Sequence, residues 1–87
     1  GFVGTMNRHP RLPSVRPENL TVTTAEEDTG ASPRRVEAQV LGAHYIGGRY
    51  ELRCDVPGAE EPWVTYSPHR FTRGETVYLN YPSSLSA

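Results

Sequence analysis

Two adjacent glycines, Gly47-Gly48, separate two stretches of alternating polarity, and this arrangement constrains the fold more than any other feature of the sequence. The arm after the glycines, 49–56, places Tyr, Leu, Cys and Val on one side and Arg, Glu, Arg and Asp on the other, as a half-buried strand requires. The arm before them, 36–46, alternates in the same way until Leu41-Gly42, where a β-bulge would interrupt the pattern. Because both glycines can adopt positive φ at no steric cost, the sequence predicts a hairpin with a two-residue turn.

A lone hairpin is only marginally stable in water, so other strands must complete the core. The remaining sequence predicts three of them, near 19–24, 62–66 and 76–81, and no reliable helix. Five short strands favour an all-β fold, a small five-stranded OB-like barrel or sandwich. A domain of 87 residues buries only about 60 to 65% of the surface that its unfolded chain exposes, so a second chain is a natural source of further burial.

The entry into the first strand, Val15 to Thr24, is predicted to be extended. In that conformation Arg16 and Glu18 share one face, two residues apart, and Pro17 suits the start of a strand or a sheet edge. The segment from Arg8 to Pro13 is too rich in proline to form a helix and is predicted to be a solvated linker. The alternative is that its Arg and His side chains attract a phosphate or an acidic partner surface.

Composition excludes several classes of function. The formal net charge is −1, whereas proteins that bind nucleic acid by neutralising phosphates normally carry a basic excess. No apolar run is long enough to cross a membrane. The one cysteine, Cys54, falls at an inward strand position, which favours a buried hydrophobe in a reducing compartment; the alternative is a reactive thiol or an intermolecular bridge.

No catalytic or metal-binding set assembles from the sequence. His9, His44 and His69 are scattered and lack the paired spacing of a zinc site. The acidic run Glu26-Glu27-Asp28 lacks the glycine-punctuated spacing of a calcium loop. Neither a phosphate-binding glycine loop nor a Gly-x-Ser-x-Gly motif is present. We therefore expect no enzyme activity and no cofactor or metal in this chain.

The aromatic residues give the strongest indication of a binding face. Four are candidates for contact with a ligand or an interface: Tyr45, Tyr50, Trp63 and Tyr66. Exposed on a barrel, such rings could stack on bases or sugars. They also alternate with apolar residues as core side chains do, so packing in the core or at an interface is the favoured interpretation.

Several stretches of the chain together resemble a TOBE domain, the transport-associated OB-type module that follows the nucleotide-binding domain in ATPase subunits of bacterial ABC importers. The resemblance rests on Val15-Arg16-Pro17-Glu18-Asn19-Leu20, on Val36-Glu37-Ala38 to Leu41-Gly42, on Tyr45 and on Tyr50-Glu51-Leu52. The opening Phe2-Val3-Gly4-Thr5-Met6-Asn7 and the closing Gly74-Glu75-Thr76-Val77-Tyr78-Leu79 are similar to the two ends of that module. The family motif would assign structural roles to Arg16, Pro17, Glu18 and Gly42.

This resemblance implies a division of the chain into a linker from an upstream ATPase domain (1–14), the OB-like TOBE domain (15–82) and a tail (83–87). It implies a non-catalytic accessory, regulatory and dimerisation domain that senses a small solute or a partner protein. ATP and Mg²⁺ would bind only in the upstream domain. The expected partners are a second copy, the ABC ATPase domain and the membrane permease subunits, with no nucleic acid and no direct membrane insertion. The expected location is the cytoplasmic side of the cell membrane.

One departure from the family pattern concerns the segment before Arg16. Further strands usually separate the Met-Asn stretch from the Arg-Pro-Glu stretch in the family, whereas here only Arg8 to Ser14 intervene. A shortened barrel would leave a sheet edge uncovered, and uncovered edges pair with other chains. We therefore expect a homodimer. The alternatives are a stand-alone OB-type module that binds an anionic small ligand or an oligonucleotide, and a purely structural interaction domain.

Overall fold

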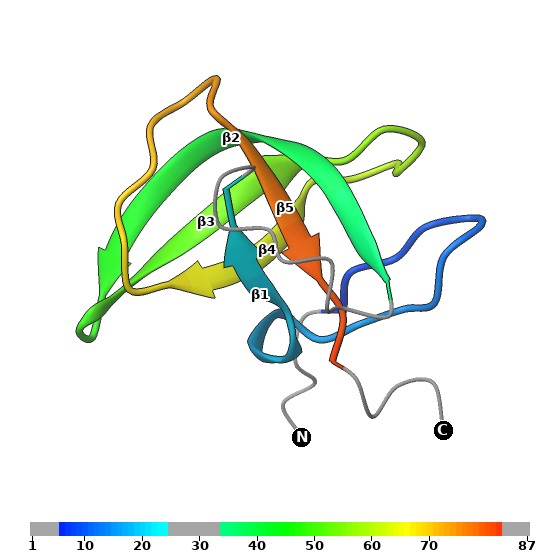
Figure 1. The fold of residues 1–87 in the computed structure, drawn as a ribbon, viewed down its shortest axis with the longest axis horizontal. Helices are drawn as coiled ribbons and strands as arrows, with labels where there is room; N and C mark the ends of the chain where they lie inside the picture. Colours follow the sequence, from blue (N-terminus) through cyan, green and yellow to red (C-terminus); the bar gives the residue numbers. More distant parts are fainter. Residues whose placement is uncertain (1–5, 25–33, 83–87) are drawn as a thin grey trace.

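Five antiparallel strands form one curled sheet in the computed structural model, which describes residues 6–24 and 34–82 (Figure 1). The strands are β1 (Thr21–Thr23), β2 (Arg35–Ile46), β3 (Arg49–Asp55), β4 (Trp63–Ser67) and β5 (Thr76–Asn80). They are ordered β1-β5-β2-β3-β4, and the two outer strands, β1 and β4, contact each other. The predicted all-β class is confirmed, and the arrangement is consistent with a small OB-like fold.

The hairpin predicted around the glycine pair joins β2 to β3. Gly47 and Gly48 form its two-residue turn with φ of 59° and 91°. The register of β2 against β3 shifts between Val40 and Gly42, so the bulge lies where the alternation of the sequence breaks. A bulge bends its strand and increases the local twist. As a result β2 pairs with β5 along its first half and with β3 along its second, and it curves over the core (Figure 1).

The core lies on the inner face of the curled sheet. Its buried apolar side chains are Val15, Leu20, Ala38, Val40, Leu52, Cys54, Val56, Trp63, Phe71, Val77, Leu79 and Tyr81. Leu52 and Cys54 alternate with the exposed Arg53 and Asp55 along β3, as predicted. On β5, Val77 and Leu79 are buried on either side of the half-buried Tyr78. Truncation of a fully buried leucine such as Leu52 would cost about 2 to 5 kcal/mol, a large fraction of the stability of so small a domain.

The prediction of an extended chain at Pro17 is wrong. Residues Pro17–Asn19 form a short 3-10 helix, η1, before β1 begins. Proline fixes φ near the helical value and lacks the N–H that a first helical turn leaves unpaired, so it favours a helix start here. Pro17 is buried, and its carbonyl accepts hydrogen bonds from the N–H of Leu20 at 3.3 Å and from the hydroxyl of Thr65 at 3.4 Å.

Three predicted features lie outside the described residues. They are the acidic run 26–28, the opening residues 2–5 and the tail 83–87. Within the described ranges, the structure contains no helix of the length and hydrophobicity that would cross a membrane.

Candidate functional site

The segment before η1 is anchored to the start of β4 through Asn7, whereas most side chains of the predicted linker, residues 8–13, are exposed. Asn7 is 2% exposed and exchanges two backbone hydrogen bonds with Val15, at 2.9 and 3.0 Å. Its side-chain amide makes two further bonds, to the N–H and the carbonyl of Val64, both at 2.8 Å. At the other end of the segment, the hydroxyl of Tyr81 donates to the carbonyl of Pro13 at 2.6 Å. The backbone of this segment is therefore held at both ends.

His9 attaches the same segment to the turn that follows β3. Its Nε2 lies 2.9 Å from the carbonyl oxygen of Pro57, and its Nδ1 accepts the N–H of Arg11 at 3.0 Å. The neutral tautomer with hydrogen on Nε2 satisfies both contacts, because that nitrogen then donates and the other accepts. Gly58, with φ of 88°, leaves room for the ring: a Cβ at this position would lie 2.8 Å from Nε2 of His9.

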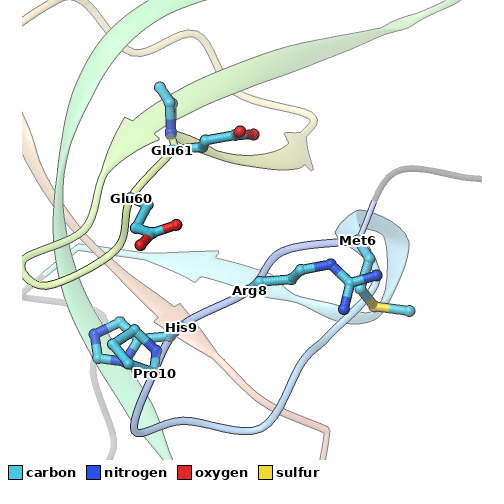
Figure 2. Close-up of a pocket in the computed structure, with 7 residues that line it drawn as sticks. Met6, Arg8, His9, Pro10, Glu60 and Glu61 are labelled. Carbon is cyan, nitrogen blue, oxygen red and sulfur yellow. The ribbon is translucent and has the colours of Figure 1, made fainter.

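A hollow of about 420 Å³ lies between this segment and the connection from β3 to β4 (Figure 2). It is lined by Met6, Arg8, His9, Pro10, Glu60, Glu61 and Pro62. The carboxylate of Glu60 points toward the space between the two segments, and the guanidinium of Arg8 extends toward Met6 (Figure 2). A charged group of each sign thus borders a partly apolar recess, which is the chemistry that a small polar solute with an ionic group requires.

Trp63, one of the four aromatic candidates, lies in the core. It is 1% exposed, and its Nε1–H donates to the carbonyl of Arg8 at 2.9 Å. Its ring meets those of His9 and Tyr81 edge-on, at centroid distances of 6.4 and 6.3 Å. Trp63 therefore packs against Arg8 and His9 of the N-terminal segment, and its ring is not accessible for stacking on a ligand.

The three tyrosine candidates gather near the free end of the hairpin, on two faces of the sheet. Tyr45 and Tyr50 are paired across β2 and β3 and meet edge-on at 5.0 Å between centroids. Tyr45 is 63% exposed, so this pair extends past the covered core. Tyr66 lies on the opposite face, where the guanidinium of Arg49 stacks over its ring at 3.8 Å. The structure thus brings two of the four candidates together and separates the others.

The four residues that the family motif marks as structural lie at two places in the fold. Arg16 precedes η1, Pro17 and Glu18 begin it, and Gly42 completes the bulge of β2. Arg16 and Glu18 are exposed, whereas Pro17 is buried. They therefore lie just before β1 and at the bend of β2, and none of them lines the hollow.

The Cys54 thiol and the potential metal ligands give no indication of a reactive or metal-binding site among the described residues. Burial raises the pKa of the Cys54 thiol to about 12, which keeps it protonated at neutral pH and argues against a reactive thiol. In the part of the chain that the structure describes, no three His, Cys, Asp or Glu side chains gather as metal ligands would.

Sequence patterns missed two residues of the site, Asn7 and His9. Both act through partners about 50 residues away, at Val64 and Pro57. A buried asparagine carries no periodic signal. The Arg/His cluster around His9 indicated an attraction for a phosphate or an acidic partner surface, but nothing in it indicated the contact with Pro57. The Met-Asn motif of the family was the one signal that could have drawn attention to Asn7.

Comparison with known proteins gives one family. The TOBE domain family matches residues 14–84, most of the chain, in agreement with the resemblance seen in the sequence. A search among curated proteins returns no match.

Proposed function

The chain belongs to the TOBE domain family, and from this membership we propose that it is the non-catalytic accessory domain of an ABC importer ATP-binding subunit. The observation that carries the proposal is the family match over residues 14–84 on an all-β sheet with β1 and β4 in contact. In this proposal ATP and Mg²⁺ bind in the ATPase domain, and the present domain transmits or stabilises its pairing. The parent complex then lies at the cytoplasmic face of the membrane, against permease subunits.

Dimerisation is the second part of the proposal. Three large apolar side chains are exposed in the described residues, and all three lie between Leu41 and Ile46. Apolar residues concentrated on one short stretch of a small domain favour an interface over a uniformly solvated surface. Two copies joined there would hold two ATPase domains near each other, which is what a dimeric ATPase requires.

Solute sensing is the third part, and the hollow beside His9 supports it. Glu60 and Glu61 offer carboxylates to a cationic group, and Arg8 offers a guanidinium to an anionic one. Two carboxylates against one guanidinium favour a small solute with a cationic group. Thermal melting of the purified protein with putrescine, glycine or inorganic phosphate compares a dication, a zwitterion and an anion. We expect putrescine to raise the melting temperature most, and the Glu60→Gln, Glu61→Gln double variant to remove that shift.

The genomic sequence that precedes the codon for Gly1 tests whether this chain is an accessory domain of an ATPase subunit. The reading frame upstream of the codon for Gly1 should encode an ATPase domain with a glycine-rich phosphate-binding loop. A start codon close to Gly1 would instead favour the stand-alone module.

Native mass spectrometry of the purified protein separates the same alternatives biochemically. We expect a dimer without a bound ligand. A monomer that retains one small molecule per chain would overturn the dimerisation part and favour the stand-alone ligand-binding module.

A further inference from the structure

The second half of β2 has a strand partner on one side only. The ladder between β2 and β5 ends at Gln39, whereas the ladder between β2 and β3 continues to Ile46. The hairpin therefore extends past β5, as Figure 1 shows on the side away from the chain termini. We call residues 42–46 of β2 the open edge.

The open edge presents backbone hydrogen-bonding groups outward. Ile46 and Arg49 flank the two-residue turn and form a hydrogen-bonded pair, as the residues that close such turns do. Hydrogen-bonded and non-bonded pairs alternate along an antiparallel ladder, so Tyr45 and Ala43 turn their N–H and C=O groups away from β3. Among the backbone hydrogen bonds that the described residues make outside their strand ladders, none involves Ala43 or Tyr45.

The side chains of the open edge differ from those of a protected edge. The segment from Leu41 to Ile46 carries no Lys, Arg, Asp or Glu, and Leu41, Tyr45 and Ile46 are 38, 63 and 49% exposed. Edge strands that must stay unpaired usually carry charges, prolines or a cover. The edge of β4 has such a cover, because the Asn7 amide occupies the backbone groups of Val64. The open edge has none among the described residues.

We propose that two copies of this chain pair antiparallel along the open edge, with His44 of one copy opposite His44 of the other. This inference rests on the dimerisation in the proposed function and gives that dimer its interface. In this register Ala43 of each copy faces Tyr45 of the other. The outward N–H and C=O groups of these four residues, two from each copy, then bond to one another. The register also sets small residues against large ones, since Gly42 faces Ile46 of the second copy.

Neighbouring registers fit less well. Pairing centred on Ala43 would set Tyr45 against the bulge at Leu41, and pairing centred on Tyr45 would set Ala43 against the turn at Gly47. Each of these two registers leaves half of the outward N–H and C=O groups without a strand partner. The absence of charged side chains means that self-pairing meets no like-charge repulsion along the strand.

Disulfide trapping tests the register. In a non-hydrogen-bonded antiparallel pair the Cα atoms lie about 4.5 Å apart, within the range of a disulfide. Mild oxidation of the His44→Cys variant should therefore give a covalent dimer on a non-reducing gel. The matched control is Glu51→Cys, which replaces the residue opposite His44 on β3. Two copies of position 51 would be three strand spacings apart, roughly 14 Å, and should not be linked.

Charge substitution tests the same contact without a covalent bond. His44→Glu and His44→Lys each place like charges opposite one another, so each variant alone should dimerise at least about tenfold more weakly than the native chain. A 1:1 mixture of the two should recover the dimer. Circular dichroism checks that each variant keeps its fold.

The outcomes separate the inference from the proposed function. A native dimer that both charge variants retain, with no preferential cross-link at position 44, overturns the strand-edge interface but leaves dimerisation intact. A native chain that sediments as a monomer at tens of micromolar overturns both.

Discussion

The side-chain amide of Asn7 pairs with the backbone of Val64 as a neighbouring strand would. Its Nδ2–H donates to the Val64 carbonyl and its Oδ1 accepts the Val64 N–H, both at 2.8 Å. Asn7 also exchanges two backbone hydrogen bonds with Val15. One buried residue thus covers the edge of β4 and fixes the chain before η1. Without it, another strand would be needed to pair with this edge.

Asn7→Ala should destabilise the fold strongly. The substitution leaves the N–H and the carbonyl of Val64 without their protein partner, and each unsatisfied group costs about 1 to 3 kcal/mol when it is buried. Since Val64 is only partly buried, water offsets some of this cost, and we expect a loss of about 2 to 3 kcal/mol in the free energy of unfolding. Urea denaturation followed by Trp63 fluorescence measures it.

Asn7→Asp is the informative companion to this variant. A carboxylate can still accept the Val64 N–H, but it has no hydrogen to donate and repels the Val64 carbonyl. We expect it to be at least as destabilising as alanine at neutral pH and to recover partly in acid, where the protonated group can donate again. Equal stability of Asn7→Asp and the native chain would contradict the paired-amide geometry.

Gly58→Ala should cost more than Gly74→Ala. Both glycines have strongly positive φ, 88° and 95°, but a Cβ at Gly74 meets no atom within 4 Å, whereas at Gly58 it lies 2.8 Å from the His9 ring. Backbone strain alone predicts about 1 to 2 kcal/mol at each position. At Gly58 the ring must also move and give up its bond to Pro57, which adds about 1 kcal/mol.

A double-mutant cycle with His9→Ala isolates that extra cost. In the His9→Ala background the two glycine substitutions should become equally destabilising, because the imidazole ring that makes Gly58→Ala the more costly of the two is absent. A persistent difference would place the cause in the backbone of the turn and not in the His9 contact.

Cys54 should resist thiol reagents while the protein is folded. With a pKa of about 12, only about one thiol in ten thousand is ionised at pH 8, and the side chain is fully buried. Labelling by a disulfide reagent should therefore be more than about a hundredfold slower in buffer than in urea. The exposed thiol of a Glu18→Cys variant, which lies outside the proposed dimer contact, provides the control, since it should react rapidly in buffer. Comparable rates for the two thiols would show that the core opens readily.

The local features of the fold could be predicted from the sequence, and the long-range ones could not. The hairpin and its bulge follow from alternation and from Gly47-Gly48, which act over a few residues. The 3-10 turn at Pro17 escaped prediction because proline fits both a strand start and a helix start, and packing against Thr65 decides between them. The role of Asn7 depends on Val64, which is 57 positions away, and no local sequence pattern indicates that the two residues are in contact.

The same distinction applies to the aromatic candidates. Sequence alone placed Tyr45, Tyr50, Trp63 and Tyr66 in one set, because alternation tells which face a side chain occupies but not how far the core extends along that face. Trp63 lies at the centre of the core, whereas Tyr45 has the same inward orientation but lies beyond its end. The extent of coverage depends on where β5 and the N-terminal segment stop, which is a property of the assembled fold.

Glu75 should make the stability of the domain depend on pH in acid. Its carboxylate accepts the backbone N–H of Thr72 at 2.6 Å and the Thr72 hydroxyl at 2.9 Å, and these bonds hold the pKa of Glu75 below its ordinary value of 4.5. Because the unfolded chain binds the proton more readily, the stabilisation is complete above pH 4.5 and is lost as the pH falls through the lower folded-state pKa.

Urea midpoints of the native chain and of Glu75→Gln, measured from pH 7 down to pH 3, test this sign. The native chain should be the more stable at neutral pH, by an amount that stays constant down to about pH 5 and then shrinks. Thr72→Val provides an intermediate case, since it removes the hydroxyl and keeps the backbone N–H. A difference between native and Glu75→Gln that did not change with pH would show that Glu75 contributes through contacts of its neutral form and not through its charge.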